Sequence, residues 1–187
     1  MSSSLFIVGG ARSGKSRFAL ADLSAGGRVA VVVTAEAGDA DMAARIARHR
    51  AERSHRWPTL EAPRDLVPRL SEALGAADTV VVDCLTLWVA NLMARGDDDE
   101  AILKEADALT ALVAAPAADL RVVSNEVGLG VHPATAEGRR FRDLLGLVNQ
   151  RVAAAAHRVV LLVAGLPLVV KDASPPSPSD VRSPEAL

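Results

Sequence analysis

Five short, almost continuously apolar runs occur along the chain, and they predict the strands of a buried sheet. They are rich in β-branched residues and do not alternate with polar positions, which is typical of strands covered on both faces. The runs are Leu5–Val8, Val29–Thr34, Thr79–Asp83, Leu120–Ser124 and Val159–Ala164.

Longer segments rich in Ala, Leu and Arg separate these runs and predict helices. They are Ser16–Leu23, Asp41–Arg53, Asp65–Leu74, Leu85–Ala94, Glu100–Val113 and Thr135–His157. The alternation of strand and helix predicts an α/β fold built on a mostly parallel, doubly wound sheet. We expect residues 1–171 to form a single domain. Residues 172–187 are rich in Ser and Pro, which offer little apolar surface to bury, so they are expected to form a flexible tail.

Composition and charge narrow the class of function. The 187 residues carry 21 basic and 23 acidic side chains, a net charge of -2, and only 3% are aromatic. This composition provides neither a large positive field nor stacking platforms for nucleic acid, so no nucleic-acid partner is expected. A single cysteine, Cys84, excludes an intramolecular disulfide. The chain has no signal-peptide pattern and no apolar run long enough for a membrane span, which predicts a soluble, cytoplasmic protein.

The segment GGARSGKS at residues 9–16 matches the P-loop pattern G-x-x-x-x-G-K-S. Glycines allow the backbone to turn successive N–H groups toward phosphate oxygens. Lys15 supplies a positive charge to the β- and γ-phosphates, and the Ser16 hydroxyl is placed to bind Mg²⁺. The segment follows an apolar strand and opens a predicted helix, as the motif requires. The sequence therefore predicts a nucleoside-triphosphate site in a P-loop nucleotide-binding fold.

Asp83 ends the run TVVVD and is the candidate second metal-orienting residue. The alternative is a strand-end carboxylate that caps the next helix. The sequence contains no Asn-Lys-x-Asp box for guanine, and no Asp-x-x-Gly follows the second acidic strand. These absences argue against a switch GTPase.

A histidine lies on the inner face of one predicted helix. At 100° per residue, His49 shares a face with Met42 and Ile46, and Arg53 joins them. Spacing alone favours a hydrogen-bonded core histidine. The other interpretation is an imidazole that attacks phosphorus while arginines neutralise the phosphates.

Four segments together resemble the bifunctional adenosylcobinamide kinase / adenosylcobinamide-phosphate guanylyltransferase family of cobalamin biosynthesis. They are GGARSGKSRFA at residues 9–19, AARIARHRAER at 43–53 followed by Trp57 and Glu61, VVVDCLTLWVANL at 80–92, and the stretch from VVSNEVGLGVHP to NQRVAAAAHRV at 122–159. The P-loop is common to many families. The H-R-A-E-R block and the N-E-V-G-x-G segment with its downstream F-R-D and N-Q are far more specific.

The resemblance implies two reactions on one chain. A nucleoside triphosphate, ATP or GTP, phosphorylates adenosylcobinamide. GTP then gives GMP to a histidine, and adenosylcobinamide phosphate accepts it to form adenosylcobinamide-GDP. The family's guanylylated histidine heads the H-R-A-E-R block, which implies that His49 is the nucleophile and reverses the preference drawn from spacing. The resemblance also implies a homotrimer. The Mg²⁺ expected from the P-loop pattern would be held by Ser16 and Asp83.

The nucleotide contacts implied by the resemblance fall in five places along the chain. They are Gly9, Gly10, Ala11, Arg12, Ser13, Gly14, Lys15 and Ser16; Thr34, Ala35 and Glu36; Arg50, Ala51, Glu52 and Arg53; Glu61; and Asp83.

Other residues and functions stay open at the level of sequence. Asn125 and Glu126 follow the end of a predicted strand, where they either meet substrate or form a turn and cap. Arg139, Arg140 and Arg142 either contact phosphate or solvate a helix face. Two rival functions are a small-molecule P-loop kinase without nucleotidyl transfer and a non-catalytic nucleotide sensor.

Overall fold

Seven strands form one sheet at the centre of the computed structural model, which describes residues 2–23, 27–36, 38, 43–44, 47 and 57–173. The strands are β1 (Ser4–Gly9), β2 (Val29–Val33), β3 (Thr59–Glu61), β4 (Thr79–Asp83), β5 (Asp119–Asn125), β6 (Arg158–Val163) and β7 (Leu166–Asp172). Their order across the sheet is β3-β2-β4-β5-β1-β6-β7. All neighbours pair in parallel except β6 and β7, which are antiparallel. The predicted mostly parallel α/β sheet is confirmed.

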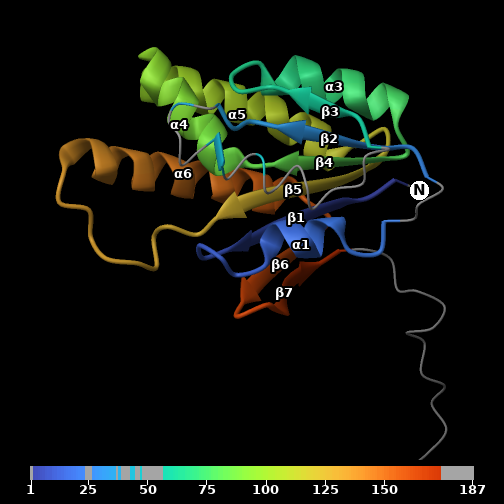
Figure 1. Cartoon of the computed structure of the whole chain (residues 1–187). Helices are drawn as coiled ribbons and strands as arrows, with labels where there is room; N and C mark the ends of the chain where they lie inside the picture. Colours follow the sequence, from blue (N-terminus) through green and yellow to red (C-terminus); the bar gives the residue numbers. More distant parts are fainter. Residues whose placement is uncertain are drawn as a thin grey trace, which may run out of the picture.

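Helices cover both faces of this sheet (Figure 1). They are α1 (Lys15–Leu20), α3 (Leu66–Ala76), α4 (Leu85–Arg95), α5 (Asp99–Ala114) and α6 (Ala136–Ala155). Buried residues of α3, α4, α5 and α6 form one hydrophobic cluster with one face of the strands. Ala19 of α1 belongs to a second cluster with Ile7, Val81 and Val123 on the opposite face. Alternate residues of β1, β2, β4, β5 and β6 therefore belong to different cores, which explains why these strand sequences read as continuous apolar runs.

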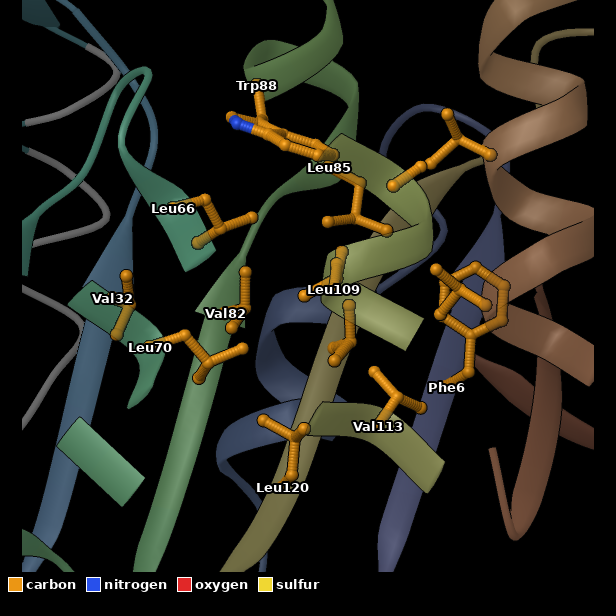
Figure 2. Packing of buried hydrophobic residues seen from close by; sticks show 14 of the residues in the cluster. Phe6, Val32, Leu66, Leu70, Val82, Leu85, Trp88, Leu109, Val113 and Leu120 are labelled. Atoms are coloured by element: carbon orange, nitrogen blue, oxygen red, sulfur yellow. The ribbon is translucent and has the colours of Figure 1, made fainter. Parts of the chain in front are cut away.

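The larger core is centred on α4 and α5. Trp88, Leu85 and Leu109 are fully buried there and lie over Val82 and Phe6 of the sheet (Figure 2). The indole nitrogen of Trp88 donates a hydrogen bond of 3.0 Å to the carbonyl oxygen of Arg64, so this buried polar group is satisfied. The packing fixes α4 directly after β4 and thereby positions Asp83.

The sequence did not predict two strands, β3 and β7. β3 has only three residues and follows Pro58. For β7 the apolar run continues past the end of β6, but it contains Gly165 and Pro167, which are typical of a break. Residues 164 and 165 instead form a tight turn with φ of 51° and 85°, and the chain returns as an edge strand. An edge position tolerates Pro167, because one side of an edge strand makes no ladder hydrogen bonds.

Several predicted boundaries need correction. Thr34 lies beyond β2 and Ala164 lies in the turn after β6, so neither belongs to a strand. β7 runs to Asp172, one residue beyond the expected end of the domain at 171. Of the predicted helix 41–53, only Ala43, Ala44 and Ala47 are among the described residues, and these three are helical. In the described part of the chain, no helix has the length and apolar character needed to cross a membrane.

Candidate functional site

The P-loop connects β1 to α1 at the carboxyl end of the sheet. β1 ends at Gly9 and α1 begins at Lys15. Gly14 has a φ of 95°, a left-handed conformation that glycine adopts without steric cost, and Arg12 also has a positive φ of 57°. The amide of Phe18 donates to the carbonyl oxygen of Gly14 at 2.9 Å, so the helix hydrogen bonds start within the motif. The loop therefore has the strand–loop–helix context that the sequence predicted.

Lys15 lies folded over the inside of this loop. Its Nζ donates to the carbonyl oxygen of Gly10 at 2.6 Å and lies 3.5 Å from the hydroxyl of Ser13. Lys15 and Ser13 are only 7% and 8% exposed. The ammonium group thus lies at the loop that would bind a triphosphate. There it can exchange its hydrogen bond to a neutral carbonyl for stronger, charge-assisted bonds to phosphate oxygens.

Strand β6 and the β6–β7 turn lie against the P-loop. A side chain at Gly9 would place Cβ 2.5 Å from the carbonyl oxygen of Leu162 and 2.8 Å from the Ser13 hydroxyl. A Cβ at Gly14 would lie 3.5 Å from the Cα of Gly165. Glycine at position 9 is therefore required by close approach of the neighbouring strand. No sequence signal pointed to the turn, because its partner in space is distant along the chain.

Asp83 ends β4, and β5 lies between β4 and β1. The turn after Asp83 is braced by Thr34, which is fully buried. The Thr34 hydroxyl donates to the carbonyl oxygen of Cys84 at 2.6 Å and accepts from its amide at 3.0 Å. The Thr34 amide donates to the carbonyl oxygen of Asp83 at 3.2 Å. Thr34 thus positions Asp83, and its predicted contact with nucleotide stays a prediction.

Hard oxygen donors suit Mg²⁺, which is usually bound through one or two protein groups together with substrate phosphates and water. Ser16 offers a hydroxyl at the start of α1, and Asp83 offers a carboxylate at the end of β4. Among the residues that the structure describes, no cluster of three or more His, Cys, Asp or Glu could hold a metal by itself. The donor set therefore fits a magnesium ion that arrives with a triphosphate.

The remaining predicted nucleotide contacts lie near the β2–β3 edge or outside the described residues. Glu36 follows β2 and pairs with Arg64 at 3.1 Å, with both side chains about two-fifths exposed. Glu61 is the last residue of β3. His49 and its neighbours Arg50, Ala51, Glu52 and Arg53 lie outside the described residues.

Asn125 and Glu126 lie directly beside the P-loop. Asn125 ends β5 at the level of Gly9, and the amide of Glu126 donates to the Gly9 carbonyl oxygen at 3.0 Å. The Glu126 carboxylate accepts from the amide of Gly128 at 2.9 Å, which forms a local turn. Sequence spacing could place both residues at a strand end but could not show that this strand adjoins β1.

The three arginines left open by the sequence make local contacts. Arg139 donates to the carbonyl oxygens of Pro133 and Ala134 before α6, and Arg140 pairs with Asp99 at the start of α5. Arg142 pairs with Asp143 at 2.8 Å and contacts His132. In this structure the three side chains thus contact the β5–α6 connection, the start of α5 and α6 itself.

Cys84 follows Asp83 and carries a perturbed thiol. Burial raises the pKa of the Cys84 thiol, and the nearby negative charge of Asp83 raises it further. A thiol in this setting stays protonated at neutral pH and is a poor nucleophile. Cys84 is therefore part of the packing beneath the site.

Comparisons with known proteins point to one family. Residues 5–170 match the model of the family described as cobinamide kinase / cobinamide phosphate guanyltransferase. The chain is 43% identical over 166 residues to a bifunctional adenosylcobalamin biosynthesis protein of Pseudomonas aeruginosa, covering 88% of this chain and 95% of that protein. A protein of the same description from Salmonella typhimurium is 38% identical over 179 residues, covering 89% and 99% of the two chains.

The structure also resembles an ATPase of the type III secretion system of pathogenic bacteria. The TM-score is 0.51 at 11% identity, and the similarity covers 86% of this chain and 51% of that chain. At this identity the likeness concerns the fold alone.

Proposed function

This chain belongs to the cobinamide kinase / cobinamide phosphate guanyltransferase family, and we propose that it carries out both reactions of that family in adenosylcobalamin biosynthesis. It phosphorylates cobinamide with a nucleoside triphosphate and then converts cobinamide phosphate to cobinamide-GDP with GTP. The observation that carries the proposal is the match over residues 5–170, which contains the P-loop, Asp83 and the β5–α6 segment. We take the adenosyl form of cobinamide as the substrate.

In the kinase step, backbone N–H groups of Gly9–Ser16 hold the β- and γ-phosphates, and Lys15 moves from the Gly10 carbonyl to the phosphate oxygens. The acceptor hydroxyl attacks the γ-phosphorus, and the bond to the β-phosphate oxygen breaks. When bound by Ser16 and Asp83, Mg²⁺ neutralises charge on the phosphates. Thr34 keeps Asp83 in place through its bonds to Cys84 and Asp83. The phosphate donor of this step is ATP or GTP.

In the guanylyltransferase step, an imidazole nitrogen of His49 attacks the α-phosphorus of GTP, and pyrophosphate leaves. The phosphate of cobinamide phosphate then attacks the histidine-bound GMP, which forms cobinamide-GDP and releases the imidazole. Splitting one transfer into two steps through a phosphoramidate is the advantage of a covalent intermediate. This role of His49 rests on the resemblance of the H-R-A-E-R block, and Arg50, Arg53 and Glu61 are its expected nucleotide-binding neighbours.

We extend the proposal to the assembly, location and limits of the chain. The resemblance supports a homotrimer, which light scattering of the purified protein tests. Its substrates, ATP and GTP, support a cytoplasmic location, which fractionation tests.

The composition of residues 174–187 supports a tail that neither step needs, so its deletion should leave both activities unchanged. Residues 1–173 would then form the single catalytic domain.

The experiment that tests the proposal follows products through both steps. The protein is incubated with adenosylcobinamide, ATP and MgCl₂, GTP is added, and the corrinoids are analysed by mass spectrometry. We expect adenosylcobinamide phosphate before the addition of GTP and adenosylcobinamide-GDP after it. Formation of the phosphate alone would leave a kinase without nucleotidyl transfer, and formation of neither product would overturn the proposal.

A further inference from the structure

One polar side chain at the end of β5, that of Asn125, lies beside the P-loop. Asn125 is the partner of Gly9 in the β1–β5 ladder, whereas Asp83 on β4 is level with Val123, two residues earlier on β5. Val123 belongs to the hydrophobic cluster on the α1 face of the sheet. Side chains alternate between the two faces, so Asn125 and Gly9 lie toward the face that bears α1. Asn125 is therefore placed between the P-loop and Asp83.

The main chain of Asn125 is fixed on both sides. Its amide donates to the hydroxyl of Thr86 at 2.8 Å, and its carbonyl oxygen accepts from the side-chain amide of Asn149 at 3.0 Å. The next amide, that of Glu126, donates to the Gly9 carbonyl oxygen at 3.0 Å. Thr86 and Asn149 are only 8% and 7% exposed. Helices α4 and α6 and strand β1 thus hold the main chain on both sides of the Asn125 Cα, and positioning of this kind is what a group near reacting atoms requires.

The side chain of Asn125 differs from those of the other two asparagines. Asn91 donates to the carbonyl oxygens of Thr34 and Pro63, and Asn149 donates to that of Asn125. Within the part of the chain that the structure describes, the Asn125 carboxamide makes no hydrogen bond, although the residue is half-buried. A half-buried amide without a partner inside the protein is suited to bind a ligand.

We propose that Asn125 is a catalytic residue of the kinase step that binds the transferred γ-phosphoryl group and the acceptor hydroxyl. Its NH₂ group donates to a γ-phosphate oxygen, and its carbonyl oxygen accepts from the hydroxyl. The hydroxyl oxygen bonds to the γ-phosphorus, the γ-phosphorus–oxygen bond to the β-phosphate breaks, the nucleoside diphosphate leaves and the hydroxyl proton is released to solvent. This assignment rests on the proposed kinase function. Glu126 does not share it, because its carboxylate closes the turn at Gly128.

Variants at two neighbouring residues test this role. Asn125→Ala removes the amide, and Asn125→Asp keeps its shape but replaces the donor with a negative charge beside phosphate. Both leave the bonds from Thr86 and Asn149 to the main chain intact. Ser124→Ala is the matched control, because Ser124 is on the same strand, points to the other face, and its hydroxyl has no hydrogen-bond partner in the described structure. Each variant is assayed as the full chain for kinase kcat and KM, for formation of the GMP–protein adduct from GTP, and for Tm.

We expect both Asn125 variants to lower kinase kcat by about 10²-fold, which is typical of losing one donor to a transition state. Asn125→Asp should be at least as impaired as Asn125→Ala, because its charge repels the phosphate. For Asn125→Ala, the KM for nucleotide, adduct formation and Tm should stay near the values of the wild type and of Ser124→Ala.

Two results would overturn the role of Asn125. One is kinase kcat near the wild-type value in both variants, and the other is an equal loss of kinase activity and adduct formation, which a structural role would produce. The proposed kinase step, on which this role rests, fails separately, when the wild-type protein itself forms no adenosylcobinamide phosphate.

Discussion

The backbone amide of Gly165 donates a hydrogen bond of 3.0 Å to the carbonyl oxygen of Ser13. Gly165 belongs to the β6–β7 turn and Ser13 to the P-loop, so the edge hairpin is tied to the phosphate-binding segment. The contact extends along β6, where the carbonyl oxygen of Leu162 approaches Gly9. The geometry of the P-loop therefore depends on a hairpin that follows it by some 150 residues in the chain.

Gly9→Ala should destabilise the protein, because the new Cβ would lie 2.5 Å from the Leu162 carbonyl oxygen. We expect a loss of about 1–3 kcal/mol in the free energy of unfolding, the range typical of overpacking. Gly10→Ala is the matched control for stability, since a Cβ there meets no atom within 4 Å. Denaturant unfolding measures both. Equal stability of the two variants would contradict the close approach.

Lys15→Ala should abolish most phosphoryl transfer and weaken triphosphate binding. Lys15 Nζ lies 2.6 Å from Gly10 O and 3.5 Å from Ser13 Oγ, both atoms of the loop that would bind the triphosphate. We expect kinase kcat to fall on the order of 10²-fold or more, as for other charged or polar groups on developing charge. Lys104→Ala, which removes an exposed lysine of α5, is the control. Near-normal turnover of the Lys15 variant would show that the P-loop does not take part in phosphoryl transfer.

Arg121→Gln should loosen the far end of the P-loop helix. Arg121 of β5 donates to the carbonyl oxygens of Ala19 at 2.9 Å and Ala21 at 2.7 Å, where α1 ends. Hydrogen bonds from a charged group contribute about 1.5–3 kcal/mol, so the free energy of unfolding should fall by roughly that amount. Arg28→Gln removes an exposed ion pair with Asp78 and should change little. Equal effects of the two substitutions would show that Arg121 does not anchor α1.

The Cys84 thiol should react slowly in the folded protein. Burial raises its pKa, so less thiolate is present at neutral pH than for a free cysteine. Because the chain has one cysteine, labelling by a thiol reagent reports this residue alone. We expect labelling in the native state to be much slower than in denaturant. Labelling at the rate of a free thiol would contradict the raised pKa of Cys84.

The same pKa shift predicts a pH dependence of stability. The pKa of the Cys84 thiol is higher in the folded than in the unfolded protein. As pH rises, the unfolded chain therefore loses this proton first, and the free energy of unfolding falls above the thiol pKa of the unfolded chain, about 8.5. Cys84→Ala removes this contribution. The free energy of unfolding should therefore fall less steeply between about pH 8 and pH 10 in the variant than in the wild type. Parallel curves for the two proteins would count against the shift.

Much of the fold could be predicted from sequence, because its signals are local. The apolar runs that became β1, β2, β4, β5 and β6 are long enough to be recognised, and the P-loop has a fixed spacing. β7 could not be predicted, since Gly165 and Pro167 break an apolar run in the same way whether the chain ends a strand or turns back. Its place beside β6 depends on pairing in space.

The residues of the candidate site could likewise be predicted from sequence only where their signal is local. The residue types and spacing of the P-loop predicted Lys15 and Ser16, and Asp83 followed from its strand end. The place of Asn125 at the level of Gly9 depends on the sheet order, which puts β5 between β1 and β4, and no spacing along the chain encodes that order. Thr34 likewise could not be assigned its contact with Cys84, because 50 residues separate them.

The central claim is that His49 carries GMP between GTP and the corrinoid. The direct measurement incubates the protein with MgCl₂ and GTP labelled at either the α- or the γ-phosphate, and then maps the label on peptides of the wild type and of His49→Ala. The account predicts α-label on His49 alone, in an acid-labile bond that resists alkali, with γ-label released as pyrophosphate. His49→Ala should form no adduct yet keep kinase activity. Wild-type adduct formation by the His49→Ala variant would contradict the claim.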